Sequence, residues 1–101
     1  MTYRLSAKAE EDIIDIFRAG VEQFGLYQAE RYHERLERCF RFLAENPLVA
    51  HERFEITPAV RIHPVEAHLV VYRVDGNGDV FIVRVRHGHE DWQAFAGTDP
   101  V

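Results

Sequence analysis

The first half of this chain repeats its apolar positions with the period of a helix. From residue 7 to residue 24, apolar side chains recur at spacings of three and four, which predicts an amphipathic helix. Ser6 is a favourable N-cap, and Gly25 is placed to end the helix in a left-handed conformation. A second helix is predicted from about Tyr27 to Glu45, with the apolar stripe Ala29, Tyr32, Leu36, Cys39, Phe40 and Leu43. The short connection between the two predicts an antiparallel helical hairpin.

After Asn46-Pro47 the period changes from 3.6 to 2, which is typical of strands. Short strands are expected at "RFEI" and "VRIH", on either side of Thr57-Pro58. Longer strands are expected at "HLVVYRV" and "VFIVRVR", around the turn sequence "DGNG". A further short strand is expected at residues 2–5, before the first helix. The order β-α-α-β-β-β predicts an α+β fold, in which the helical hairpin packs on one face of a small, mostly antiparallel sheet.

The last strand alternates valine with arginine and therefore predicts what the second face of the sheet carries. If Val83 and Val85 point toward the helices, Arg84 and Arg86 point toward the opposite, uncovered face. Such a face is either solvated or used to bind a partner.

Length and composition indicate one globular domain that spans residues 1–101, with residues 97–101 as a frayed tail. No apolar run is long enough to cross a membrane, and the N-terminus lacks the apolar core of a signal peptide. Cys39 is the only cysteine, so no internal disulfide is expected. These observations predict a cytoplasmic protein.

The charge disfavours a nucleic-acid binder, because neutralising phosphates requires a basic face. The net charge is −5, and all the basic residues except Lys8 are arginine. Arginine pairs well with carboxylates, so arginines on a sheet suggest an acidic protein partner at least as readily as a phosphate backbone.

The residue types present bear on three kinds of catalytic or metal site. A zinc site could draw on His63, His68, His87 and His89, but Cys39 lies on an apolar helix stripe and no Cys-x-x-Cys or comparable spacing occurs, so no metal is expected. Motifs of nucleophilic hydrolases and of nucleotide-binding loops are absent. A metal-free ribonuclease remains an alternative, because such an enzyme needs a general base, a general acid and residues that bind phosphate. Residues of these types occur at Arg61, Glu66, Arg84, Arg86, His87 and His89.

Four stretches of the chain, in this order, carry a resemblance to a known family. They are the helical segments "LSAKAEEDIIDIFRAGVEQFG" and "QAERYHERLERCFRFLAENP", the strand region "VRIHPVEAHLVVYRVDGNGDVFIVRV" and the terminal "RHGHEDW". Over nearly its whole length the chain resembles the ParE branch of the RelE/ParE toxin superfamily, the toxins of bacterial toxin–antitoxin operons. The family fold, a helical hairpin on an antiparallel sheet, agrees with the pattern described above.

The resemblance implies a type II toxin that inhibits DNA gyrase by binding and is neutralised by a ParD-type antitoxin. It implies no catalytic residue, no cofactor and no direct contact with nucleic acid. RelE-like relatives cleave mRNA in the ribosomal A site instead, and a toxin of that kind would use Arg61 and Arg86 on phosphate with His87 or His89 as general acid. No tyrosine follows Arg86-His87, however, and the "EDW" continuation resembles ParE proteins. A third alternative is a non-toxic relic that still binds antitoxin.

The resemblance also implies binding residues. Pairing with antitoxin acids is expected at Arg61, Arg73, Arg84 and Arg86. Contact with gyrase is expected at His87, His89, Glu90, Asp91 and Trp92, although Trp92 could instead anchor the tail to the core.

Overall fold

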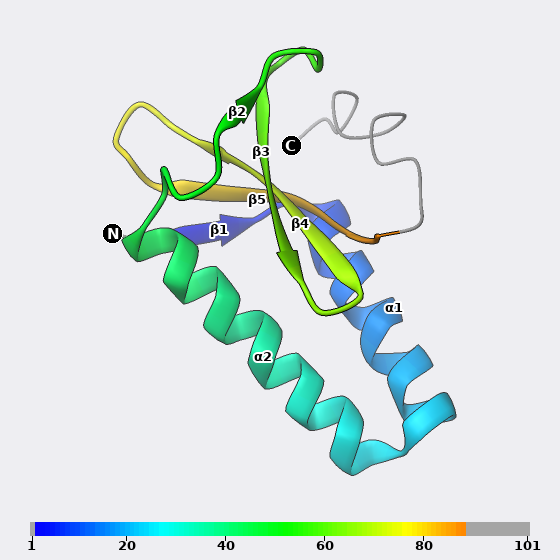
Figure 1. Cartoon of the computed structure of the whole chain (residues 1–101). Coiled ribbons are helices and arrows are strands. Elements are labelled where there is room, and N and C mark those ends of the chain that lie inside the picture. Colours follow the sequence, from blue (N-terminus) through cyan, green and yellow to red (C-terminus); the bar gives the residue numbers. More distant parts are fainter. Residues whose placement is uncertain (1, 89–101) are drawn as a thin grey trace.

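The computed structural model describes residues 2–88 of the chain, which form two layers (Figure 1). A five-stranded sheet has the order β1-β5-β4-β3-β2, in which β1 pairs parallel with β5 and the other neighbours are antiparallel. The elements are β1 (Tyr3–Leu5), α1 (Ala7–Phe24), α2 (Leu26–Glu45), β2 (Glu52–Arg53), β3 (Val60–Val65), β4 (His68–Val74) and β5 (Val80–His87). The predicted α+β class, with a helical hairpin on one face of the sheet, is confirmed.

The helical hairpin begins and turns where local signals place it. The Ser6 hydroxyl oxygen accepts a hydrogen bond from the Ala9 N–H at 2.9 Å and donates to the Val83 carbonyl at 2.7 Å, so one side chain caps α1 and ties it to β5. Gly25, with φ of 88°, lies between the helices. At Gly20 the helices approach so closely that an added Cβ would lie 3.3 Å from the Cβ of Ala29. The turn of the hairpin lies away from the sheet (Figure 1).

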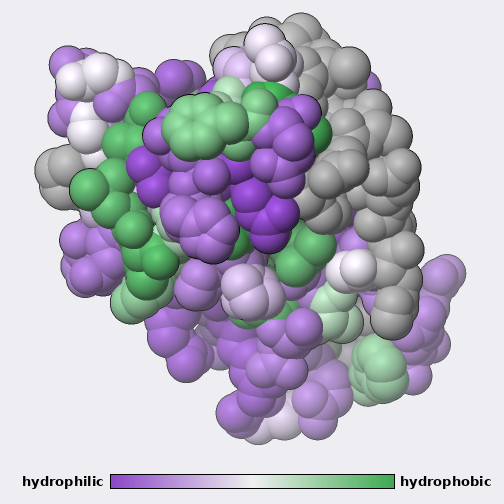
Figure 2. All heavy atoms as spheres, turned by 45° about the horizontal axis from the view of Figure 1, so that its top comes forward, coloured by the Kyte–Doolittle hydropathy of each residue, from purple (hydrophilic) through white to green (hydrophobic). Residues whose placement is uncertain are grey.

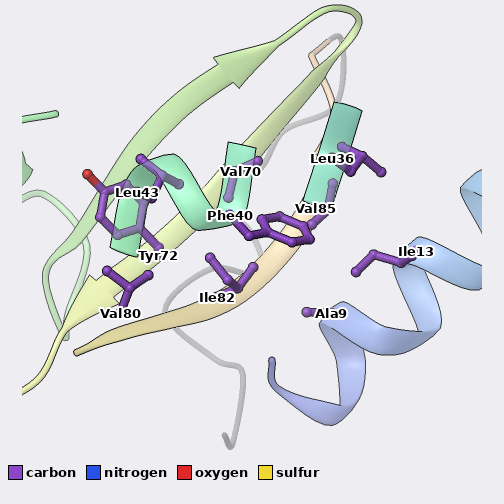
Figure 3. Packing of buried hydrophobic residues seen from close by; sticks show 10 residues of the cluster. All are labelled: Ala9, Ile13, Leu36, Phe40, Leu43, Val70, Tyr72, Val80, Ile82 and Val85. Carbon is purple, nitrogen blue, oxygen red and sulfur yellow. The ribbon is translucent and has the colours of Figure 1, made fainter. Parts of the chain in front are cut away.

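The main core lies between the hairpin and the sheet. Figure 3 shows side chains of α1 and α2 meeting those of β4 and β5. The buried members are Ala9, Ile13, Leu36, Phe40, Leu43, Val70, Tyr72, Val80, Ile82 and Val85. Cys39 packs against this cluster, as the helix stripe predicts.

The face of the sheet away from the helices is not bare. It carries a second buried cluster of Ile56, Val60, Val71, Phe81 and Val83. The prediction that Val83 and Val85 point the same way is wrong, because Val71 pairs with Arg84 while Tyr72 pairs with Ile82, which leaves Val83 as the extra residue of a β-bulge. One extra residue reverses the alternation of side chains beyond it. Val83 therefore packs on the outer face and Val85 in the main core.

The segment between α2 and β3 differs from the prediction of a strand at "RFEI". Only Glu52–Arg53 pairs with β3, and the chain then leaves the sheet, carrying Ile56 onto the outer face. Pro58, which has no N–H for the ladder, lies in this segment. Figure 2 brings this end of the molecule forward and shows patches of hydrophobic residues (green) interrupted by hydrophilic residues (purple). Phe54 stays 74% exposed here.

Within the described residues, neither helix is long and apolar enough to cross a membrane.

Candidate functional site

A cleft of about 710 Å³ lies between the helical hairpin and the ends of β4 and β5. Its apolar walls come from the facing sides of the two helices near their turn, where the hairpin lies beyond the sheet (Figure 1). Apolar wall residues include Ile13, Ile16, Phe17, Ala29 and Leu36. A concave, mostly apolar site edged by a few polar groups is the usual form of a binding site.

The sheet side of the cleft carries a tyrosine and two histidines. The Tyr32 hydroxyl lies 2.6 Å from Nδ1 of His68 and 3.3 Å from the carbonyl of Val65, so it can donate to either acceptor. His68 pairs in register with His87 on the next strand, and their rings lie 5.3 Å apart. Burial raises the pKa of Tyr32, which keeps its phenol protonated. No sequence signal linked Tyr32 to His68, because 36 residues separate them.

Beside this group, Asp12 of α1 holds two arginines of β5. Arg84 donates from Nε and Nη2 to the two carboxylate oxygens at 2.9 and 3.1 Å, and Arg86 donates from Nη1 at 2.9 Å. The Val85 N–H also donates to Asp12, at 3.0 Å. Because β1 pairs only with the first part of β5, this carboxylate closes the strand edge that β1 leaves open. Arg84 and Arg86 are thus held at this edge and do not stand on an open face.

Asp12 lines this site, and the sequence analysis did not identify it. It lies three positions after Ala9 and next to Ile13, both of which are buried. An acid so close to the apolar stripe of an amphipathic helix was the available signal.

The other two predicted arginines lie elsewhere. Arg61 is the register partner of Tyr72, whose ring belongs to the main core, so it faces the helix layer. Its guanidinium donates to the Ala50 carbonyl, and the Tyr72 hydroxyl donates to Pro47 at 2.9 Å. Through these hydrogen bonds, both side chains attach the segment that follows α2 to the sheet.

Arg73 lies on the outer face, with its guanidinium carbon 5.6 Å from the ring centre of Phe81. Arg4 packs over the same ring at 4.5 Å. The structure thus brings Arg84 and Arg86 together but not Arg61 and Arg73.

The residues of the ribonuclease alternative are not gathered at one point. Arg61 is in register with Tyr72, which pairs with Ile82, five positions before His87 on β5. One of these five positions is the bulge residue Val83, so four ladder steps of about 3.3 Å separate Arg61 and His87 by about 13 Å along the strands. His89, Glu90, Asp91 and Trp92 lie outside the described residues.

The histidines do not assemble a metal site within residues 2–88, where no group of three or more potential ligands converges. His68 and His87 lie together, but His63 contacts the ring of Phe42 at 5.7 Å.

Burial raises the pKa of the Cys39 thiol to about 11.

Comparisons with known proteins agree on one family. The model described as "ParE toxin of type II toxin-antitoxin system, parDE" matches residues 3–92. The chain is 33% identical over 89 residues to Toxin ParE1 of Mycobacterium tuberculosis, covering 88% of this chain and 91% of the relative. It is 30% identical over 95 residues to Toxin ParE1 of Caulobacter vibrioides, covering 94% and 97%. A solved structure titled "Chromosomal ParDE TA system from P. aeruginosa" shares the fold, with a TM-score of 0.72, 22% identity and coverage of 86% of this chain and 95% of that one.

Proposed function

Because this chain belongs to the ParE family of type II toxins, we propose that it inhibits DNA gyrase by binding and that a ParD-type antitoxin silences it. Its site of action is then the cytoplasm. It acts without a cofactor, and no residue serves as a catalyst. The observation that carries the proposal is the cleft between the hairpin and the sheet.

The cleft has the character of a docking groove for a protein segment. Its volume of about 710 Å³ and its apolar walls suit several side chains of a partner. Arg86 and His87 line it, so these two residues are the best placed of the predicted antitoxin and target contacts. Arg61 and Arg73 contact antitoxin only if its chain extends around the sheet.

The separation of Arg61 from His87 favours inhibition by binding over mRNA cleavage. A general acid and a phosphate-binding arginine have to reach the same phosphodiester, within hydrogen-bond distances of it. A separation of about 13 Å along the strands, with β4 lying between β3 and β5, is too far for that. The resemblance to ParE proteins at "RHGHEDW" supports the same conclusion.

The antitoxin silences the toxin if it binds the same surface of this chain that gyrase contacts. The proposed gyrase contacts begin at His87, which also lines the cleft, and continue through His89, Glu90, Asp91 and Trp92. An antitoxin segment seated in the cleft covers His87 and blocks access of gyrase. The toxin and antitoxin then form the resting complex.

A supercoiling assay tests this function. Relaxed plasmid, ATP and purified gyrase are incubated with increasing amounts of the toxin, freed from its antitoxin by denaturation and refolding. We expect supercoiling to fall, or linear DNA to be trapped after protein digestion, and toxin saturated with antitoxin to have no effect. Unchanged supercoiling by a toxin that still kills cells would refute gyrase as target and direct attention to ribosome-bound mRNA. Normal colony counts after induction without antitoxin would identify the non-toxic relic.

A further inference from the structure

The outer face of the sheet carries two arginines that are held against one aromatic ring. We propose that Arg4 and Arg73, seated on Phe81, bind a carboxylate side chain of the target protein, on the face of the sheet opposite the cleft. The inference rests on the proposed function, because it names a part of the surface through which the toxin contacts gyrase. Arg4 and Arg73 are called the outer arginine pair below.

Neighbouring strands bring the two arginines to the same ring. Arg4 of β1 and Arg73 of β4 are the register partners of Phe81 on the two sides of β5. Tyr3 and Leu5 pack against the main core, so Arg4, which lies between them, points to the outer face. The guanidinium carbons of Arg4 and Arg73 lie 4.5 and 5.6 Å from the centre of the Phe81 ring.

The ring is a fixed support for both guanidiniums. Phe81 is 5% exposed and packs with the outer cluster of Ile56, Val60, Val71 and Val83. A side chain packed in this way keeps one rotamer, and cation–π attraction holds a guanidinium near its ring. The two arginines therefore lose less conformational entropy on binding a ligand than arginines that project freely into water.

The outer arginine pair concentrates positive charge. Both guanidinium carbons lie no more than 5.6 Å from one ring centre, so the two charges are at most about 10 Å apart, roughly one Debye length at 0.1 M salt. Asp79, close to Phe81 on the chain, accepts a hydrogen bond from the Thr2 N–H at 3.3 Å. The ion pairs between arginines and acids within residues 2–88 belong to other arginines, namely Arg35, Arg53, Arg61, Arg84 and Arg86. A bound anion would therefore relieve the repulsion between Arg4 and Arg73.

The surroundings of the pair favour a carboxylate of a protein over the phosphates of a nucleic acid. A guanidinium matches either anion. A nucleic-acid duplex, however, is held by neutralising several phosphates, whereas the cluster beside the pair is apolar and the chain carries −5. A protein segment that presents one acid flanked by apolar side chains matches this face.

The position of the pair favours the target over the antitoxin as the source of the carboxylate. An antitoxin segment seated in the cleft lies on the helix side of the sheet and leaves the outer face uncovered. Phe81 precedes His87, where the proposed gyrase contacts begin, by six positions, one of which is the bulge residue Val83. The separation along β5 is then about 16 Å, which fits within an interface of ordinary size. One gyrase-binding surface can therefore include both places.

Comparing gyrase inhibition with antitoxin binding tests the inference. Arg4→Gln, Arg73→Gln and the double variant are assayed for the toxin concentration that halves supercoiling and for affinity to purified gyrase subunits without DNA. Affinity for the antitoxin, the product of the adjoining gene, is measured by calorimetry. Each substitution should weaken inhibition and subunit binding about tenfold, because a charged hydrogen bond is lost. The double variant should lose little more, since both guanidiniums hold one carboxylate.

Antitoxin binding and a distant arginine serve as controls. Antitoxin affinity should stay within twofold of the wild type in all three variants, which also shows that they fold. Arg38→Gln removes an exposed arginine of α2 that does not line the cleft, and it should inhibit gyrase as the wild type does. Raising the salt concentration should weaken subunit binding more for the wild type than for the double variant.

The outcomes separate the arginine pair from the proposed function. A wild-type toxin that binds antitoxin but neither binds nor inhibits gyrase would refute gyrase as the target, and with it the ligand assigned to the pair. Inhibition that the double variant matches would overturn the arginine pair alone. Equal losses of gyrase and antitoxin affinity would assign the two arginines to the antitoxin or to the fold and would also overturn the inference. Binding of the wild type to a DNA duplex alone, abolished in the double variant, would assign a phosphate in place of the carboxylate.

Discussion

Replacing Asp12 by alanine should destabilise the fold more than any other single loss of charge among the described residues. Asp12 is 4% exposed, and its carboxylate accepts four hydrogen bonds, three from the guanidiniums of Arg84 and Arg86 and one from the Val85 N–H. The variant leaves two positive charges without this acceptor, and the Arg84 side chain is only 12% exposed. Removing one partner of a buried ion pair costs about 3–5 kcal/mol, a large part of the roughly 5–15 kcal/mol that stabilises a domain of this size.

Urea unfolding followed by far-ultraviolet circular dichroism measures this loss. With an m-value of about 1.5 kcal/mol per molar urea, the midpoint should fall by about 2–3 M. The matched control is Asp15→Ala, one turn further along α1 at an exposed position, which should change stability by less than about 0.5 kcal/mol.

Two results would refute this reasoning. A loss below about 1 kcal/mol for Asp12→Ala would mean that the arginines find other acceptors or water at little cost. An equal loss for Asp15→Ala would mean that the effect belongs to the helix and not to the buried charge cluster. A variant in which Asp12, Arg84 and Arg86 are all replaced by apolar residues should recover much of the stability, because no charge is then left buried and unpaired.

Three further predictions concern residues with defined contacts. Tyr72→Phe should lower the free energy of unfolding by about 1 kcal/mol in the same urea assay, because the Pro47 carbonyl loses its donor; no change would mean that water replaces the hydroxyl. Cys39, with a pKa of about 11 instead of its ordinary 9, should react with a disulfide reagent at pH 8 about 100-fold more slowly in the folded chain than in urea, since only the thiolate attacks; equal rates would contradict its burial in the core. Arg61→Ala should reduce stability by loosening the Ala50 connection but retain gyrase inhibition in the supercoiling assay; loss of toxicity in a variant that still folds would favour the ribonuclease.

Most of the elements could be predicted from the chain, because their signals are local. The Ser6 cap and Gly25 bound α1 as expected, and "HLVVYRV" and "VFIVRVR" form β4 and β5 around the expected turn. Caps, turns and periodicity act over a few residues and can be read without knowing what packs against them. The prediction of a strand at "RFEI" was wrong because a short apolar run does not determine whether the segment pairs with a neighbouring strand or crosses to the outer face of the sheet.

The candidate site could be predicted only in part. Arg86 and His87 line the cleft, whereas Arg61 and Arg73 lie on opposite faces of the sheet. The sequence pattern places Tyr32 on a helix stripe and offers His68 as a possible zinc ligand, but it does not predict that the two side chains meet. Their contact depends on how α2 crosses the sheet.

The sequence by itself determined the helical hairpin, the strand pair around "DGNG", the α+β class and the family. The tertiary structure alone decided where the charged side chains lie. The bulge at Val83 reversed the alternation of β5, and α1 then brought Asp12 to arginines 72 and 74 positions away in the chain. Local preferences act between neighbours and survive in any packing, whereas register and side-chain pairing across such separations exist only once the layers have assembled.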